Sequence, residues 1–299
     1  MAKLKNFSNF DVKITQMEIY YTIKDLQNAL NKYSSQKQSI GFVPTMGALH
    51  EGHLSLIRCS KQRDDIIVVS IFVNPTQFND PKDLERYPRM LDEDIRKLQT
   101  VDCDILFAPS EQEMYPEPDT RVFDFGYLDK VYEGKYRPGH FNGVAQIVSK
   151  LFDIVKPNRA YFGQKDYQQL LIVKELVRKY MPNSGIEIIS CPIIREADGL
   201  AMSSRNMLLD PQQRKSAAKI SQVLFKAKEM AKAKSPHQIK QMAIEALNAD
   251  KYLRVEYFDI VDAQTLKPIE DFEQAKKIIA ITAVYCGNVR LIDNLFLKE

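Results

Sequence analysis

The chain has 299 residues, of which 44% are hydrophobic, and its 42 basic and 39 acidic side chains leave a formal charge of +3. This length and apolar content suit one large or two ordinary globular domains. The near balance of charge argues against a nucleic-acid-binding face or a polybasic membrane anchor, so small molecules are the expected partners.

Two further features indicate a cytoplasmic protein. The four cysteines are widely spaced and form no Cys-x-x-Cys pair, which is typical of reduced core thiols rather than of disulfides or structural zinc. The longest apolar run, at residues 66–73, is far too short to span a bilayer. We therefore expect neither a membrane segment nor an export segment.

The first part of the chain alternates between helical and strand patterns. Residues 1–16 show no clear period and precede a second methionine, Met17, so they are expected to be either an N-terminal extension or the result of a misplaced start. Apolar runs predict strands at 39–43, 66–73, 103–108 and 159–162, and apolar positions three or four apart predict helices at 22–31, 54–62, 90–98, 144–155 and 167–180. This alternation predicts an α/β fold with a Rossmann-like, doubly wound parallel sheet, in which ligands bind at the carboxyl ends of the strands.

The second part of the chain predicts a smaller α+β domain. The sequence Pro-Asn-Ser-Gly at 182–185 has the composition of a linker, so we place the domain boundary near residue 185 and divide the chain into 1–185 and 186–299. The expected elements are strands at 186–190, 254–261, 278–285 and 289–292, a polar loop at 195–206, and lysine-rich helices at 211–233 and 236–249.

The segment at residues 41–53, GFVPTMGALHEGH, contains two of the four histidines and is predicted to run from a strand into a helix that begins near His50. Glycines let the backbone approach a ligand closely, and the free N–H groups of a helix start favour an anion such as phosphate. His50 and His53 lie on one side of the first helical turn, where both imidazoles can donate to a phosphate. The alternative is a histidine pair bonded to the backbone; zinc is disfavoured because further ligands are lacking nearby.

Two other polar segments could hold phosphates beside these histidines. Residues 163–166, GQKD, follow a predicted strand, and residues 202–205, MSSR, lie in the polar loop of the second domain. Taken separately, each such segment is more often an ordinary solvated turn. In the predicted topology the strand-end turns come together and the loop can close over them, which suggests a nucleotide held between two domains.

Each of the remaining candidates has a structural alternative. Gln77 and Gln169 could hydrogen-bond a small polar substrate, but without further context a surface glutamine is favoured for either. Glu93 and Asp94 could hold Mg²⁺ on phosphates or simply be solvated. Glu133 and Arg137 are expected to form a weak surface ion pair, His140 is explained equally by helix capping, and His237 is expected at the surface.

Six segments resemble the pantothenate synthetase (pantoate–β-alanine ligase) family of the His-x-Gly-His nucleotidyltransferase superfamily. They span most of residues 17–299 in family order and are PTMGALHEGH (44–53), SIFVNPTQF (70–78), YPR (87–89), RPGHF (137–141), YFGQKDYQQ (161–169) and READGLAMSSRN (195–206). The resemblance implies a cytoplasmic homodimer that uses ATP and Mg²⁺ to join (R)-pantoate to β-alanine through pantoyl adenylate, releasing AMP and pyrophosphate.

The resemblance also implies roles for individual residues. His53 is the implied proton donor, and His50 stabilises the phosphates. The residues implied to bind ATP are Met46, Gly47, Ala48, Leu49, His50, Glu51, Gly52, His53, Gly163, Gln164, Lys165, Asp166, Ile194, Met202, Ser203, Ser204 and Arg205. Of these, Lys165, Ser203, Ser204 and Arg205 bind phosphate and complete the catalytic set. Gln77 and Gln169 bind pantoate, with Asn74 as a weaker contact and Gln77 also near β-alanine.

One departure from the family and two alternative functions accompany this interpretation. Glu93 stands where some relatives have Asp, which leaves Asp94 as the better Mg²⁺ candidate. The chain could instead be a nucleotidyltransferase that adenylylates a phosphate-bearing small molecule. It could also be a nucleotide-binding module without turnover, although the intact histidines, Lys165 and Ser-Ser-Arg argue against that function.

Overall fold

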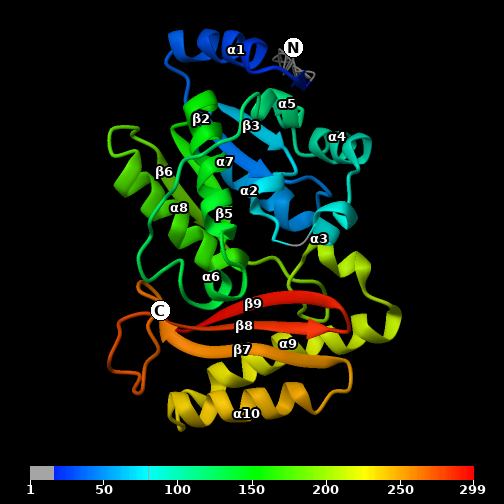
Figure 1. Cartoon of the computed structure of the whole chain (residues 1–299), viewed down its shortest axis with the longest axis vertical. Coiled ribbons are helices and arrows are strands. Elements are labelled where there is room, and N and C mark those ends of the chain that lie inside the picture. Colours follow the sequence, from blue (N-terminus) through cyan, green and yellow to red (C-terminus); the bar gives the residue numbers. More distant parts are fainter. Residues whose placement is uncertain (1–16, 80) are drawn as a thin grey trace, which may run out of the picture.

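A large α/β domain and a smaller α+β domain lie one above the other in Figure 1. The computed structural model describes residues 17–79 and 81–299, so the extension expected at 1–16 lies outside the described residues. Within this part, none of the helices is both long and apolar enough to cross a membrane.

A six-stranded parallel sheet forms the centre of the large domain, as predicted. Its strand order is β1-β4-β3-β2-β5-β6. The strands are β1 (Glu18–Tyr20), β2 (Ile40–Thr45), β3 (Ile66–Ile71), β4 (Ile105–Phe107), β5 (Arg159–Gly163) and β6 (Glu187–Cys191). The chain leaves β2 towards β3 and β4, and later returns to add β5 on the other side of β2. The topological switch point therefore lies between β2 and β5, where this type of sheet binds ligands.

Helices cover both faces of this sheet because neighbouring strand residues point to opposite sides. Phe42 and Val68 pack with α1 (Ile23–Ser35), α7 (His140–Val155) and α8 (Tyr167–Tyr180). Val43 and Val69 pack with α2 (Glu51–Lys61) and α4 (Leu91–Gln99) on the other face. Short helical segments complete the domain: η1 (Pro75–Gln77), α3 (Pro81–Arg86), α5 (Glu111–Met114), α6 (Tyr132–Tyr136) and η2 (Gln164–Asp166).

The domain boundary predicted at residue 185 is too early. β6 pairs in parallel with β5, from Arg159 opposite Glu187 to Gly163 opposite Cys191, so it is the last strand of the large sheet. The turn at 182–185 connects α8 to β6 within that domain, with Gly185 at a φ of +69°. A turn inside a domain and a linker between domains share the same Pro, Asn, Ser and Gly composition.

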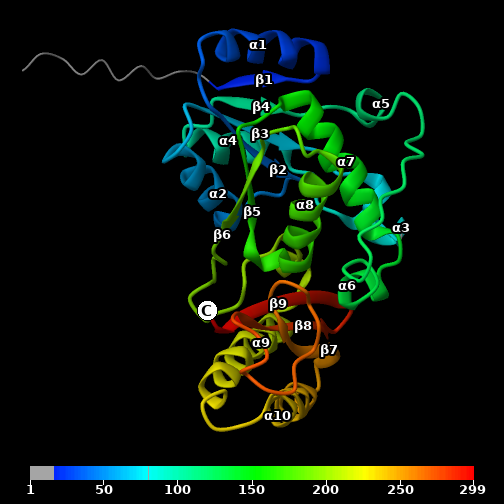
Figure 2. The same ribbon diagram turned by 90° about the vertical axis from the view of Figure 1, so that its left-hand side faces the viewer.

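The small domain has a three-stranded antiparallel sheet covered by two helices. The sheet order is β7-β8-β9, formed by β7 (Leu253–Asp262), β8 (Ile278–Cys286) and β9 (Val289–Lys298), and the helices are α9 (Pro211–Met230) and α10 (Pro236–Asn248). In Figure 2 this sheet lies between its helices and the large domain. One face of the small sheet is therefore turned toward the large domain. The strand expected at 289–292 is longer than predicted.

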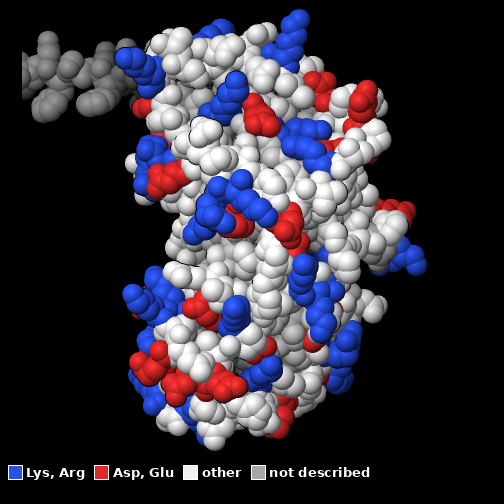
Figure 3. All heavy atoms as spheres, turned by 60° about the vertical axis from the view of Figure 1, so that its left-hand side comes forward, with Lys and Arg blue, Asp and Glu red and all other residues white. Residues whose placement is uncertain are grey.

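Buried charge joins the two domains. Glu133 of α6 accepts two hydrogen bonds from Arg290 of β9, at 2.6 and 2.8 Å, and one from the Tyr257 hydroxyl of β7 at 2.9 Å. The Glu133 side chain is 9% exposed, and Arg137 lies 3.7 Å from it. The expectation of a weak surface pair is wrong, because Glu133 is buried between the domains and bound mainly by Arg290. Away from this contact, Lys and Arg are interspersed with Asp and Glu over the face in Figure 3.

Candidate active site

The turn between β2 and α2 carries the two histidines to the switch point. Gly47 has a φ of +79°, which L side chains rarely adopt, and Ala48 follows with a φ of +49°. This left-handed bend reverses the chain so that His50 becomes the N-cap of α2. The predicted helix start near His50 is confirmed.

Each histidine of this turn bonds to the backbone and still keeps one ring nitrogen for a ligand. His50 Nδ1 accepts from Gly52 N–H at 3.1 Å, and His53 Nδ1 accepts from His50 N–H at 3.3 Å. A backbone N–H can only donate, so both Nδ1 atoms are unprotonated and a neutral ring carries its proton on Nε2. Both rings line a large cavity and lie 4.0 Å apart between centroids. The backbone-bonded and ligand-binding interpretations of the pair are therefore compatible.

Burial keeps both imidazoles neutral. It lowers the pKa of His50 to about 4, with a further contribution from the Lys165 charge. It lowers the pKa of His53 well below its usual value, and His50, Lys165 and Lys97 act in the same direction. The pair is thus suited to donating Nε2–H hydrogen bonds to an anion at neutral pH.

We expect the His50 ring in the ligand-free protein to titrate near pH 4 and to keep its Nε2–H tautomer above pH 5.5, because protonation would add charge to a buried site. Between about pH 6.5 and 4 the unfolded chain binds the extra proton and the folded chain does not, so this histidine makes the folded state less stable as pH falls through that window. Imidazole ¹⁵N chemical shifts measured against pH test this. A midpoint near 6.5, the ordinary value of an imidazole in water, would contradict it.

Two side chains of α4 hydrogen-bond to the backbone of this turn. Both carboxylate oxygens of Asp94 accept backbone hydrogen bonds, from Ala48 N–H at 2.8 Å and from Leu49 N–H at 2.6 Å. One helical turn further, Lys97 Nζ donates to Leu49 O at 2.7 Å. Asp94 is completely buried. These contacts fix the three peptide groups that precede His50.

The position of Asp94 is at odds with the predicted role in Mg²⁺ binding, because both its oxygens already accept amide protons. Glu93 forms an ion pair with Lys97 at 2.7 Å instead. Among the described residues, no group of three or more His, Cys, Asp or Glu side chains is placed to hold a metal ion.

A cavity at the switch point, which is open to solvent and contains about 1270 Å³ of empty space, is lined by most of the predicted site residues. Its polar lining comes from the turns that follow β2, β3 and β5 and from the polar loop, which lie far apart in the sequence. The predicted residues that line it are Met46, His50, Gly52, His53, Asn74, Gln77, Gly163, Lys165, Asp166, Gln169, Ile194, Met202, Ser203, Ser204 and Arg205. The expected meeting of three segments is thus seen in the structure.

Five residues predicted to bind ATP do not line this cavity. They are Gly47, Ala48, Leu49, Glu51 and Gln164. The Leu49 side chain is 2% exposed and packs in the core beneath the sheet, and Glu51 forms an exposed ion pair with Arg58. Gln164 contributes its carbonyl to Asn294 of β9 at 2.9 Å. These residues shape the turns instead of facing the cavity.

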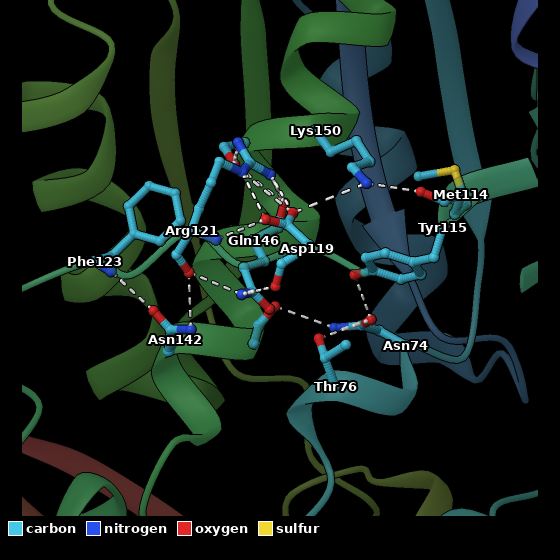
Figure 4. A network of polar contacts seen from close by, with 12 residues as sticks. Asn74, Thr76, Met114, Tyr115, Asp119, Arg121, Phe123, Asn142, Gln146 and Lys150 are labelled. Atoms are coloured by element: carbon cyan, nitrogen blue, oxygen red, sulfur yellow. Dashed lines mark hydrogen bonds and ion pairs between the residues drawn. The ribbon is translucent and has the colours of Figure 1, made fainter. Parts of the chain in front are cut away.

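The Gln77 side chain is positioned by a buried polar network. Asn74 is 1% exposed and donates to Gln77 Oε1 at 3.2 Å and to Gly143 O at 3.1 Å. The side-chain oxygen of Asn74, Oδ1, accepts from the Tyr115 hydroxyl at 2.8 Å. Figure 4 shows Asn74 at one end of a polar network that continues along α7. At Gly143 a Cβ would come within 2.3 Å of Thr76 O, so only glycine allows this close packing. Asn74 is therefore more suited to positioning Gln77 than to binding a substrate.

The polar loop of residues 195–206 contacts both the histidine turn and α3. Ser204 Oγ donates to Ala48 O at 3.1 Å, and Arg205 forms an ion pair at 2.8 Å with Asp83 of α3. Ser203 is the N-cap of the short helix η3 (Ser204–Leu208) and accepts from Arg205 N–H at 3.3 Å. The loop thus covers the histidine turn with its hydroxyls at the cavity.

Several lining residues were missed by sequence reasoning. One wall of the cavity is apolar and comes mainly from α7, with Phe72, Val144, Ile147, Val148, Leu151 and Phe162. The only sequence signal was the unusually apolar character of the helix at 144–155, which is equally typical of a core helix. Tyr87 also lines the cavity, and burial raises its pKa.

Comparison with known proteins gives consistent matches over nearly the whole chain. The family model described as Pantoate-beta-alanine ligase matches residues 18–296. A pantothenate synthetase from Bacteroides fragilis (strain YCH46) is 51% identical over 283 residues, which cover 95% of this chain and 100% of that protein. One from Fervidobacterium nodosum is 47% identical over 284 residues, covering 94% of this chain and 100% of that protein.

Solved structures show the same fold. A pantothenate synthetase from Thermus thermophilus has a TM-score of 0.89 and 43% identity, covering 95% of this chain and 100% of that chain. A pantoate-beta-alanine ligase from Francisella tularensis, complexed with beta-gamma ATP and beta-alanine, has a TM-score of 0.78 and 37% identity, covering 94% of this chain and 98% of that chain.

Proposed function

The chain belongs to the pantoate-beta-alanine ligase family, and from this premise we propose that its switch-point cavity joins (R)-pantoate to β-alanine using ATP. In the first step, a pantoate carboxylate oxygen forms a bond to the α-phosphorus of ATP, and pyrophosphate leaves with the electrons of the broken P–O bond. In the second, the amine nitrogen of β-alanine bonds to the acyl carbon. The acyl C–O bond breaks, AMP leaves, and the nitrogen loses a proton.

One observation carries this proposal: His50, His53, Lys165 and the 203–205 segment converge on one cavity large enough for a nucleotide and a small acid. Phosphoryl transfer depends mainly on positioning and on stabilising charge at the phosphate oxygens. Two neutral imidazoles with Nε2–H donors, one ammonium and one guanidinium provide that stabilisation at low desolvation cost. His53 donates a hydrogen bond to the oxygens that gain charge as pyrophosphate leaves, and His50 stabilises the same phosphates.

The acid substrate fits the part of the cavity between Gln77, Gln169 and α7. Pantoate has a carboxylate, two hydroxyls and a carbon bearing two methyl groups. The two amides can bind its oxygens without adding charge, and the apolar residues of α7 can cover its methyl groups. The carboxylate then points toward the histidines, where the α-phosphate would lie.

Mg²⁺ enters this proposal as part of the ATP substrate. The described residues form no metal cluster, and both oxygens of Asp94 are engaged by backbone amides. An ion that keeps most of its water and binds chiefly to phosphate oxygens needs no protein cage. We therefore assign no step of the chemistry to a protein-bound metal.

We also propose that the protein is a homodimer, as the family resemblance implies, and that it is located in the cytoplasm. Sedimentation velocity of the purified chain tests whether it is a dimer. A single species at the mass of one chain, 34.5 kDa, at micromolar concentration would count against a dimer.

Exchange of labelled pyrophosphate into ATP tests the proposed first step. Exchange requires reversible adenylate formation, so it is expected with pantoate and Mg²⁺ present and β-alanine absent. No exchange upon addition of pantoate would remove the ligase function. Adenylylation of a phosphate-bearing acceptor, without any pantothenate from pantoate and β-alanine, would favour the related nucleotidyltransferase instead.

A further inference from the structure

Strand β9 of the small domain contacts both segments that the proposed function assigns to the phosphates of ATP. In Figures 1 and 2 it is the strand of the small sheet that lies nearest the large domain. Asn294 of β9 contacts η2, which contains Lys165, and the preceding residue Asp293 contacts Arg195 at the start of the polar loop. Neither β9 residue is among those that line the switch-point cavity, so any effect they have on the chemistry is indirect.

Asn294 holds the backbone on both sides of Lys165. Its Nδ2 donates to Gln164 O and to Lys165 O, each at 2.9 Å, and the residue is 3% exposed. Because a carbonyl oxygen can only accept, the side-chain nitrogen of Asn294 must face the two carbonyls, and both its protons are used. These carbonyls belong to the peptide groups that precede and follow the Lys165 Cα. One side-chain amide therefore fixes the direction in which the Lys165 side chain leaves the backbone.

Arg195 anchors the polar loop to the same place on β9. Its guanidinium donates two hydrogen bonds to the Asp293 carboxylate, at 2.7 and 3.0 Å, and a third to Asn294 O at 3.1 Å. The Asp293 side chain is 2% exposed and that of Arg195 is 15% exposed, so solvent screens this ion pair little. The start of the loop is thus held by the residues that hold η2.

The loop carries this anchor to its other end. Its two arms form a backbone bridge between Arg195 and Ala201, and Met202 N–H donates to Ile194 O at 3.0 Å. Residues 203–205 follow this hairpin directly. β9 therefore holds both segments and sets the distance between them.

We infer that Asn294 is a positioning residue for adenylate formation, an inference that rests on the proposed ligase function. In that function Lys165 and residues 203–205 bind oxygens of one triphosphate, so their separation must match it. Phosphoryl transfer depends strongly on positioning, and a displacement of about 1 Å can lower a rate by about 10²-fold. Without Asn294 the peptide groups around Lys165 lose their common partner, and the ammonium occupies its productive position less of the time.

The substitution Asn294→Ala tests this inference in the first half-reaction. We expect kcat for pantoate-dependent pyrophosphate exchange to fall about tenfold or more, while the KM for pantoate, which Gln77 and Gln169 bind, changes less than about twofold. Asn294→Ser can still donate one hydrogen bond and should lie in between. Circular dichroism and the melting temperature show whether each variant is folded, and the serine variant carries the test should the alanine variant not fold.

A double-mutant cycle separates the positioning of Lys165 from a purely structural role of Asn294 in capping η2. Lys165→Gln removes the charge that Asn294 positions, so adding Asn294→Ala to it should lower the exchange rate by less than about twofold more. The same tenfold loss in both backgrounds would overturn the inference, because the effect would not pass through Lys165. A wild-type exchange rate in folded Asn294→Ala would overturn it as well.

Tyr132→Phe is the matched control, because it also removes one hydrogen bond between the domains, from the Tyr132 hydroxyl to Asp259 Oδ2 at 3.2 Å. Tyr132 is not among the residues that line the switch-point cavity, so exchange should be unchanged. A loss equal to that of Asn294→Ala would assign the effect to weakened contact between the domains and contradict the inference. Absence of exchange in the wild-type protein would instead remove the proposed function itself, and this inference with it.

Discussion

His53→Ala is expected to lower the rate of pantoyl adenylate formation by about 10²-fold or more, the usual loss when a preorganised transition-state donor is removed. The His53 ring is neutral, its Nδ1 is occupied by the His50 backbone amide, and Nε2–H is the donor that remains for the phosphates. Stabilisation of this kind matters most as charge develops, so kcat for pyrophosphate exchange should fall more than the KM for ATP rises. Exchange kinetics measure both values.

The fold must be shown to survive this substitution. Circular dichroism and the melting temperature of His53→Ala should stay close to those of the wild-type protein, since the substitution removes only one long backbone hydrogen bond and the ring contact with His50. His237→Ala, at an exposed histidine near the start of α10, is the control and should retain full activity. Wild-type exchange in a folded His53→Ala protein would exclude this residue from the mechanism.

Asp94→Asn is expected to lower adenylate formation by up to about 10²-fold although Asp94 is not among the residues that line the substrate cavity, because small displacements of reacting groups have effects of this size. An asparagine side chain has one acceptor oxygen, so one of the Ala48 and Leu49 amides loses its partner and faces an NH₂ group. A buried amide left without a partner costs about 1–3 kcal/mol, and moving the turn to recover it would displace His50 and His53. Exchange kinetics and chemical denaturation measure the two effects.

Glu93→Gln is the matched control on the same helix. It removes only a partly exposed pair with Lys97, so activity and stability should change little. A Mg²⁺ titration distinguishes a positioning role from a metal-binding role for Asp94. Should Asp94→Asn require more Mg²⁺ yet reach the wild-type rate and stability when saturated, Asp94 would be a metal ligand after all.

The sequence was sufficient to predict the sheet and the meeting of its turns. The buried strand at 66–71, IIVVSI, is β-branched at every position except Ser70, and the alternation of apolar strands with amphipathic helices constrains the topology. Once β2 and β5 are neighbours, His50 and Lys165 must lie at the same edge. The positions of His50 and Lys165 were therefore predictable, because each residue lies in a turn whose geometry is determined by the local sequence.

What the sequence could not predict depends on contacts between distant residues. Ala48 and Leu49 belong to the histidine motif, but the left-handed bend at Gly47 turns them toward the core and toward Asp94, 45 or 46 residues away. A carboxylate that caps a distant turn and one that binds a metal are identical in sequence. Glu133 illustrates the same limit, because its partner Arg290 lies 157 residues away in the other domain.

The most direct test of the central claim follows one oxygen atom. If the pantoate carboxylate attacks the α-phosphorus of ATP, pantoate labelled with ¹⁸O in its carboxylate must transfer one labelled oxygen to AMP when the complete reaction with β-alanine has run. Mass spectrometry of the AMP is expected to show that single label. Unlabelled AMP, or label in inorganic phosphate with ADP as the nucleotide product, would contradict an adenylate intermediate at the cavity of His50 and His53.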